Sequence, residues 1–330
     1  MRPPAALIRT ARCLWQTEWR LLMSGLGPAD AAGRYRRPAP AFGALPPLPQ
    51  NAAARDSHVL IVGRSCPWAH RAWLVHRLRR LEGSISLLVV DPDPAAGRWR
   101  FAEPFEGCGT LAELYRLSGA AAGTPATVPA LWSRQQRRIL VNESARLIEL
   151  LDSWPQEAAT GPAIATLQPP SRCEAVARWR ARLQETVNDG VYRCGFARNQ
   201  AAYDEAEAEF SASLEAAEQA LLEEEQRGPG WLCGGAEPSL ADVLLFPTLV
   251  RQELVYAPLF GCSRRPLWQL PALWRWRARF HRLPEVAASC DGEAWRRDYF
   301  GALFPLHPSG IIPAGPDLAT VVQGMPPAAV

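Results

Sequence analysis

The segment Arg64–Arg71, which reads Arg-Ser-Cys-Pro-Trp-Ala-His-Arg, holds the residues best suited to chemistry. The run before it, His58–Gly63, is apolar and rich in β-branched residues, which predicts a buried strand. After it, leucines recur at helical spacing from Leu74, and Pro67 suits a first helical turn because it lacks an N–H. Cys66 is therefore expected where a strand ends and a helix begins. Free N–H groups and the helix dipole there favour the thiolate, which is the nucleophilic form.

Two other interpretations of Cys66 compete with catalysis. A single cysteine in an apolar stretch is more often a small buried hydrophobe than a nucleophile. Cys66 and His70 lie four residues apart on one helical face, but zinc needs further ligands, and no second pair at metal spacing occurs in the sequence. Ala69 occupies the second-thiol position of a C-x-x-C redox motif, so this is a site with one thiol. Any disulfide that Cys66 forms must be with a substrate or a small thiol.

The composition narrows the class of protein. With 330 residues, 48% hydrophobic and 21% charged, the chain is expected to be a soluble globular protein with an ample core. A net charge of +3 is too small to imply nucleic acid. No window holds about 18 consecutive apolar residues, so no membrane span is expected. The eight cysteines are scattered and form no compact disulfide framework, which favours a reducing, cytoplasmic setting.

Residues 57–152 are predicted to form one α/β unit around Cys66. After the first helix, the sequence predicts a strand, a helix, two strands and a last helix. In that order they are Ile85–Val90, Thr110–Leu117, Thr127–Trp132, Arg138–Val141 and residues 144 to about 152. A long loop is expected over Asp91–Gly109. This order is that of a thioredoxin-like domain. Val128–Pro129 enters a strand where that fold keeps a cis proline beside the active thiol.

The tripeptide Asn142-Glu-Ser144 opens the last helix of that unit. It offers a carboxylate and a hydroxyl beside the free N–H donors of a helix N-terminus, a setting that suits an anionic ligand. The alternative is a plain N-cap, which these residue types also favour.

The rest of the chain is predicted to be helical or proline-rich. Residues 1–56 form an N-terminal arm, expected to lie on the folded body, with a short amphipathic helix over Leu7–Leu22. Residues 153–170 form a linker, residues 171–300 a helical domain and residues 301–330 a tail. Arginines alternate with tryptophans in the helix that runs from Leu273 to Leu283. This pattern can indicate stacking on nucleic acid, but we expect the apolar face in the core and the arginines in solvent.

A thioredoxin-like domain followed by an all-helical domain is the plan of cytosolic glutathione transferases. Five segments resemble the glutathionyl-hydroquinone reductases, the Xi class of these transferases, in the same order: Cys66-Pro-Trp-Ala-His-Arg71, Val128-Pro-Ala-Leu-Trp132, Asn142-Glu-Ser144, Gly190-Val-Tyr-Arg-Cys-Gly-Phe196 and Ala241-Asp-Val-Leu-Leu-Phe-Pro-Thr-Leu-Val-Arg251. The resemblance runs from about residue 57 to residue 316.

The resemblance implies an activity. These enzymes use glutathione as a co-substrate to reduce glutathionyl-hydroquinones, and they release the hydroquinone and glutathione disulfide. Cys66 would attack the sulfur of the glutathionyl group, and a second glutathione would resolve the mixed disulfide by thiol exchange. A homodimer is also expected.

The resemblance further implies a glutathione site. The backbone of Val128 would pair with the cysteinyl part of glutathione. Glu143 and Ser144 would hold its γ-glutamyl end, and Trp99 in the long loop would cover the tripeptide.

Aromatic residues complete the site that the resemblance implies. Tyr192 and Tyr299 match positions that face the hydroquinone, where a phenol would stabilise the leaving oxygen. The pair usually follows a histidine, which is Asp298 in this chain.

The sequence also departs from the family before Thr127, where Pro125-Ala126 replaces a usual arginine. Either one charged contact to a glutathione carboxylate is missing, or Arg134 or Arg98 supplies it. Two rival functions stay open. An omega-like thioltransferase, acting on glutathionylated proteins or dehydroascorbate, shares the cysteine but does not need the tyrosines. A non-catalytic binding module would need neither Cys66 nor the Glu143-Ser144 pair.

Overall fold

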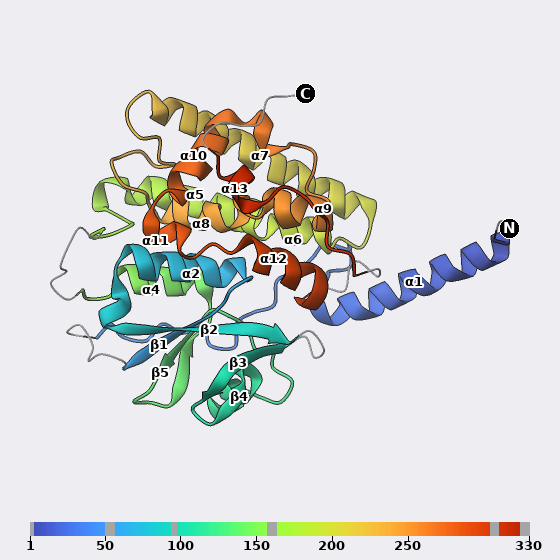
Figure 1. Cartoon of the computed structure of the whole chain (residues 1–330), viewed down its shortest axis with the longest axis horizontal. Helices are drawn as coiled ribbons and strands as arrows, with labels where there is room; N and C mark the ends of the chain where they lie inside the picture. The colour runs from blue at the N-terminus through green and yellow to red at the C-terminus, as the bar shows by residue number, and fades with distance from the viewer. Residues whose placement is uncertain (1–2, 50–56, 94–97, 157–163, 304–309, 324–330) are drawn as a thin grey trace.

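A six-stranded mixed sheet forms one layer of the protein (Figure 1). The computed structural model describes residues 3–49, 57–93, 98–156, 164–303 and 310–323. The strand order is β4-β3-β2-β1-β5-β6, and β1 pairs in parallel with β2 and antiparallel with β5. The strands are β1 (His58–Gly63), β2 (Ile85–Asp93), β3 (Arg98–Phe105), β4 (Cys108–Thr110), β5 (Ala130–Ser133) and β6 (Arg138–Val141). With α2 (Pro67–Leu78), α3 (Leu111–Leu117) and α4 (Ser144–Asp152), they confirm the predicted thioredoxin-like order.

The predicted loop after β2 is wrong, because residues 98–105 and 108–110 form strands at the sheet edge. Two features hid them. Phe101 is the one fully buried residue of β3, so the alternation of apolar and polar residues is weak. Pro92 and Pro104 argue against regular central strands, but Pro92 lies beyond Val90, the last residue of β2 that pairs with β1, and Pro104 lies where the pairing of β3 with β4 is irregular.

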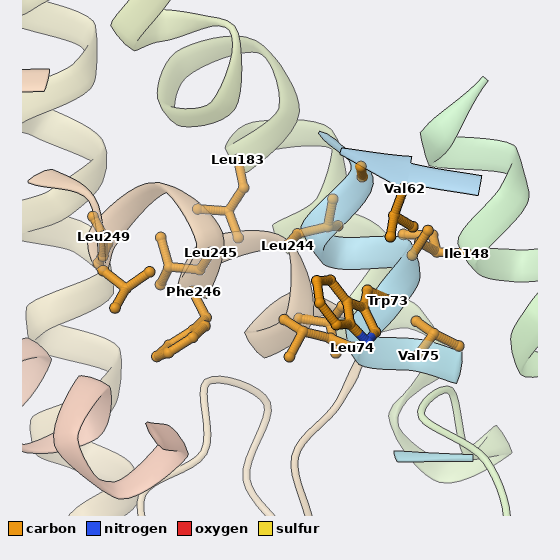
Figure 2. Close-up of a cluster of buried hydrophobic side chains, with 14 of the residues drawn as sticks. Val62, Trp73, Leu74, Val75, Ile148, Leu183, Leu244, Leu245, Phe246 and Leu249 are labelled. Carbon is orange, nitrogen blue, oxygen red and sulfur yellow. The ribbon is translucent and has the colours of Figure 1, made fainter. Parts of the chain in front are cut away.

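Helices make up the second part of the chain. They are α5 (Cys173–Leu183), α6 (Gly190–Gly195), α7 (Gln200–Glu225), α8 (Leu240–Leu249), α9 (Ala257–Phe260), α10 (Pro271–His281), α11 (Pro284–Ala287), α12 (Gly292–Asp298) and α13 (Leu318–Val321). Helix α2 lies between the sheet and these helices (Figure 1). Figure 2 shows Leu244 and Phe246 of α8 next to Trp73 and Leu74 of α2. The two parts therefore share one hydrophobic core.

Helix α8 is apolar on every side and is the centre of this core. All ten of its residues are buried, and a capping box between Ser239 and Asp242 begins it. The stretch Leu240–Phe260 has the length and hydropathy of a membrane-spanning helix, but 78% of its apolar 18-residue segment is buried inside the fold. Burial all round is what a core helix requires.

The prediction that the arginines of α10 all face solvent is wrong for Arg277. This guanidinium is fully buried, donates to the Leu249 carbonyl at 3.0 Å and pairs with Glu253 at 2.6 Å. The expected core face, with Leu273, Trp276 and Phe280, is confirmed.

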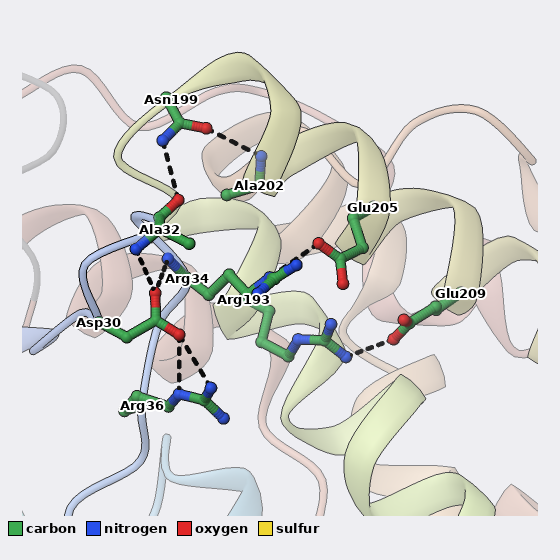
Figure 3. Close-up of polar contacts among 9 residues, drawn as sticks. All are labelled: Asp30, Ala32, Arg34, Arg36, Arg193, Asn199, Ala202, Glu205 and Glu209. Carbon is green, nitrogen blue, oxygen red and sulfur yellow. Dashed lines mark hydrogen bonds and ion pairs between the residues drawn. The ribbon is translucent and has the colours of Figure 1, made fainter.

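The N-terminal arm is anchored at one end only. Helix α1 (Ala5–Leu26) is longer than predicted and projects from the body (Figure 1), with Trp15 66% exposed and Met23 its single buried residue. The prediction that the arm lies on the body is therefore wrong for α1. The chain after α1 does contact the body. Figure 3 shows Asp30 holding a turn of the arm, from which Arg34 pairs with Glu205 of α7 at 2.8 Å.

The predicted domain boundaries remain predictions. Residues 50–56 and 157–163, at the end of the arm and inside the linker, lie outside the described residues, as do residues 304–309 and 324–330 of the tail. Where the tail is described it folds back on the helices, because Val321 is buried and the Gln323 carbonyl accepts from the Trp274 indole at 2.7 Å.

Candidate active site

Cys66 is the N-cap of α2, with Pro67 in the first helical turn, as the sequence predicted. The Cys66 carbonyl accepts from the His70 N–H at 2.9 Å, which begins the helix. The backbone N–H groups of Trp68 and Ala69 point at the sulfur. The Cys66 thiol donates to the Val128 carbonyl, 3.6 Å away.

Two opposing effects set the protonation of Cys66. Burial raises the pKa of the Cys66 thiol above its ordinary value, while the N–H groups of Ala69 and Trp68 and the more distant Arg251 and Arg37 lower it. Burial prevails, so the expectation that the helix alone favours a thiolate is wrong for the free protein. The helix N-terminus acts in the predicted direction, but burial reduces the hydration that would stabilise a charged sulfur.

Cys66 opens into a cavity of about 400 Å³. Six of the seven residues that the sequence placed at the site line it: Cys66, Trp99, Val128, Glu143, Tyr192 and Tyr299. They come from both parts of the chain, because α6 carries Tyr192 and the turn after α12 carries Tyr299. The fold therefore brings together a thiol, a carboxylate and two phenols.

One wall of the cavity is formed by Trp99 and Val128. The Val128–Pro129 bond is cis, which confirms the expectation for this position. Trp99 lies on β3 opposite Pro92, so it belongs to a strand rather than to a loop. A methyl group built on Gly63 would lie 2.5 Å from the Trp99 ring, so only glycine lets the indole pack there.

The tyrosines form a chain of phenols. The Tyr192 and Tyr299 hydroxyls are 2.7 Å apart, and the Tyr256 hydroxyl lies 3.3 Å from that of Tyr299. Burial, helped by Tyr256, raises the pKa of both Tyr192 and Tyr299 well above the ordinary value. Both are therefore neutral hydroxyls that can donate a hydrogen bond. Sequence reasoning missed Tyr256, since its helix carries no motif that separates it from core aromatics.

Glu143 and Ser144 have different surroundings. Glu143 caps α4 through the Ala145 N–H at 3.1 Å and lines the cavity. Ser144 is fully buried, and its hydroxyl accepts a short hydrogen bond from Arg71. Its side chain is therefore committed to Arg71 and lies off the cavity wall, which the sequence could not indicate.

Other predicted candidates lie elsewhere. His70 is buried, with one ring nitrogen 2.8 Å from the Ser289 hydroxyl and the other 2.9 Å from Arg251. Arg98 and Arg134 do not line the cavity, and Arg134 pairs with Glu106 at 3.3 Å. Among the described residues that line the cavity, the cation is Arg37, from the N-terminal arm. No sequence signal identified it, because the arm has no helical or strand periodicity at that point.

Comparison with known proteins decides the family. The glutathione S-transferase N-terminal domain matches residues 65–154, and the C-terminal domain matches residues 200–279. The glutathionyl-hydroquinone reductase PcpF of Sphingobium chlorophenolicum is 33% identical over 78% of this chain and 82% of its own length. The chain belongs to the glutathionyl-hydroquinone reductase family. A second member, YqjG of Escherichia coli, is 31% identical over 87% of this chain and 90% of its own.

Solved structures of glutathione transferases agree with the fold described above. The glutathione-bound structure of YqjG aligns with a TM-score of 0.71 and covers 83% of this chain and 88% of that one. The glutathione transferase Xi of Phanerochaete chrysosporium, 27% identical, aligns with a TM-score of 0.76 over 90% of this chain and 96% of that one.

Proposed function

We propose that this protein reduces glutathionyl-hydroquinones with glutathione, and that Cys66 is the catalytic nucleophile. The observation that carries the proposal is the placement of one thiol, at a helix N-terminus, in the same cavity as two neutral phenols. The thiol suits attack on a glutathionyl sulfur, and the phenols suit a hydroquinone. Membership of the reductase family supports the same reaction.

In the first step, the Cys66 thiolate attacks the glutathionyl sulfur of the substrate. The carbon–sulfur bond breaks, the hydroquinone leaves with the electron pair and takes up a proton, and Cys66 is left in a disulfide with glutathione. Tyr192 and Tyr299 donate hydrogen bonds to the hydroquinone oxygen, which lowers the cost of the charge that develops there. Their raised pKa keeps both hydroxyls protonated for this role.

In the second step, the thiolate of a second glutathione attacks the mixed disulfide. Glutathione disulfide leaves and Cys66 returns as a thiolate. Over the two steps, one glutathionyl-hydroquinone and one glutathione are converted to one hydroquinone and one glutathione disulfide. Trp99 covers the tripeptide in both steps, Val128 pairs with its backbone, and Glu143 holds its γ-glutamyl ammonium group. Because the Ser144 hydroxyl is held by Arg71, Ser144 contributes through its backbone N–H at the start of α4, where a helix leaves N–H groups without intrahelical partners.

The test measures hydroquinone and glutathione disulfide by mass spectrometry after the enzyme is mixed with a glutathionyl-hydroquinone and glutathione. Cys66→Ser should lose the bulk of turnover with its fold intact. Cys290→Ser is the matched control, because Cys290 lies outside the cavity and burial raises its pKa to about 12. Wild-type turnover in Cys66→Ser would refute the assignment.

The same assay separates this reaction from that of an omega-like thioltransferase. Tyr192→Phe and Tyr299→Phe should slow hydroquinone release more than reduction of an aliphatic disulfide, which has no phenol to stabilise. Equal losses on both substrates would mean that the tyrosines only pack, and would favour the thioltransferase.

Compartment and assembly belong to the same proposal. All eight cysteines are free thiols, which suits the reducing cytoplasm. We place the protein there as a homodimer, in which a second copy covers exposed apolar side chains such as Trp15 and Leu21 of α1. Light scattering on the full chain tests the dimer, and a monomer would contradict it.

A further inference from the structure

The N-terminal arm forms a wall of the active-site cavity. Tyr35 and residues 37–41 of the arm line the cavity together with Trp99. Asn142 fixes this wall through two bonds to Phe42: the Asn142 side-chain oxygen accepts from the Phe42 N–H at 2.8 Å, and the Asn142 N–H donates to the Phe42 carbonyl at 2.9 Å. The Phe42 ring packs edge-on against Tyr115, with centroids 5.4 Å apart. The wall is therefore attached directly beside Glu143.

Arg37 is the cation on this wall. Its guanidinium lies 4.1 Å from the centroid of the Trp68 ring and 3.5 Å from the Glu143 carboxylate. The same ring carries a second guanidinium, that of Arg71, at 4.6 Å. A guanidinium placed over an aromatic ring can still bind an anion through the N–H groups at its edge.

Two carboxylates accompany these two cations. Glu143 lines the cavity, and Asp189 lines the adjoining cleft that Arg37 and Tyr35 also line. Burial raises the pKa of the Asp189 carboxyl, and Arg37 opposes that rise. One oxygen of Asp189 is buried and has no hydrogen-bond partner among the described residues. The cluster thus offers both signs of charge within reach of one small ligand.

We infer that Arg37 binds the α-carboxylate of the γ-glutamyl end of glutathione, while Glu143 and Asp189 take its ammonium group. An α-amino acid presents both charges on one carbon, which matches a cluster that holds both charges around Trp68. The 3.5 Å pair between Arg37 and Glu143 is longer than a charge-assisted hydrogen bond, so each partner can take up a closer ligand group. The inference rests on the proposed use of glutathione, and makes the arm part of the binding site.

Calorimetry of glutathione binding to the full chain tests this role. Arg37→Gln should weaken the binding of glutathione roughly tenfold or more, as expected for the loss of a hydrogen bond between charged groups. Arg36→Gln is the matched control. It removes the same charge from the next residue, but Arg36 lies outside this cavity, is 68% exposed and pairs with Asp30 at 2.8 Å. An unchanged affinity in Arg37→Gln would overturn the inference.

A glutathione analogue separates pairing from packing. In 4-aminobutyryl-cysteinyl-glycine the γ-glutamyl carboxylate is replaced by hydrogen. Wild type and Arg37→Gln should bind it equally, because the group that Arg37 pairs with is absent. An equal loss on both ligands would show that Arg37 only shapes the wall, and would overturn the inference. Arg37→Lys keeps the charge and should bind glutathione more tightly than Arg37→Gln does. This variant tests the role of the charge even if glutamine at position 37 disturbs the fold.

Turnover of the wild type with a glutathionyl-hydroquinone distinguishes the two levels of the proposal. If wild type turns over and Arg37→Gln binds glutathione normally, the role of Arg37 fails and the proposed function stands. If wild type does not turn over, the proposed function itself fails.

Discussion

Gly63→Ala tests the position of Trp99 through a single methyl group. The new Cβ would lie 2.5 and 2.6 Å from two carbons of the Trp99 ring and 3.0 Å from a methyl of Val128. Carbon atoms in contact are about 3.5–4.0 Å apart, so the ring must move by about 1 Å or more. Overpacking of this kind costs about 1–3 kcal/mol in the free energy of unfolding. Because Trp99 lines the cavity, the KM for glutathione should rise as well.

Urea denaturation of four variants measures the clash: Gly63→Ala, Gly228→Ala, Trp99→Ala and the double variant. Gly228→Ala is the control, because Gly228 is exposed and a methyl built there meets nothing within 4 Å. In the Trp99→Ala background, Gly63→Ala should lose most of its cost and keep only that of the smaller contact with Val128, since the two side chains no longer compete for one space. The reasoning is refuted if Gly63→Ala behaves like the control, or if its cost is unchanged without the indole.

Three further predictions concern the arm, the thiol and the core. Asn142→Ala should lower the free energy of unfolding by about 1–3 kcal/mol and speed proteolysis of the arm, since the partly buried Phe42 N–H loses its acceptor; an unchanged digestion rate would contradict this. Alkylation of Cys66 should accelerate with pH up to and beyond the ordinary thiol pKa of about 8.5, because burial raises its own pKa; a plateau below neutral pH would contradict it. Asp152→Asn should lower the free energy of unfolding, measured in urea, by about 3–5 kcal/mol because the buried Arg79 loses its ion-pair partner. Glu174→Gln, at an exposed ion pair, should lower it by less than about 1 kcal/mol. Equal losses in the two variants would refute the argument.

The features that the sequence predicted well are those with local causes. Cys66 follows an apolar strand and precedes Pro67, and these neighbours alone determine that it caps a helix. Tyr192 and Tyr299 are far apart in the chain, and the family resemblance rather than any pattern placed them in one cavity.

What the sequence could not predict depends on packing between distant segments. Arg37 reaches the cavity because Asn142 holds the arm from 100 residues away. Ser144 reads as a ligand-binding hydroxyl, but Arg71 occupies it from the neighbouring helix. The sequence around Cys66 predicts a thiol activated by its helix, yet burial in the folded protein raises the pKa of that thiol. Each of these outcomes depends on a partner that no local pattern reveals.

The most direct test of the central claim is the mass of the intact enzyme after a single turnover. The wild type is mixed with an equimolar glutathionyl-hydroquinone in the absence of free glutathione, and the protein and the released hydroquinone are measured together. We predict that the protein gains one glutathionyl group, that peptide mapping places it on Cys66, and that added glutathione removes it as glutathione disulfide. Release of hydroquinone with no adduct, or an adduct on another cysteine, would contradict the account.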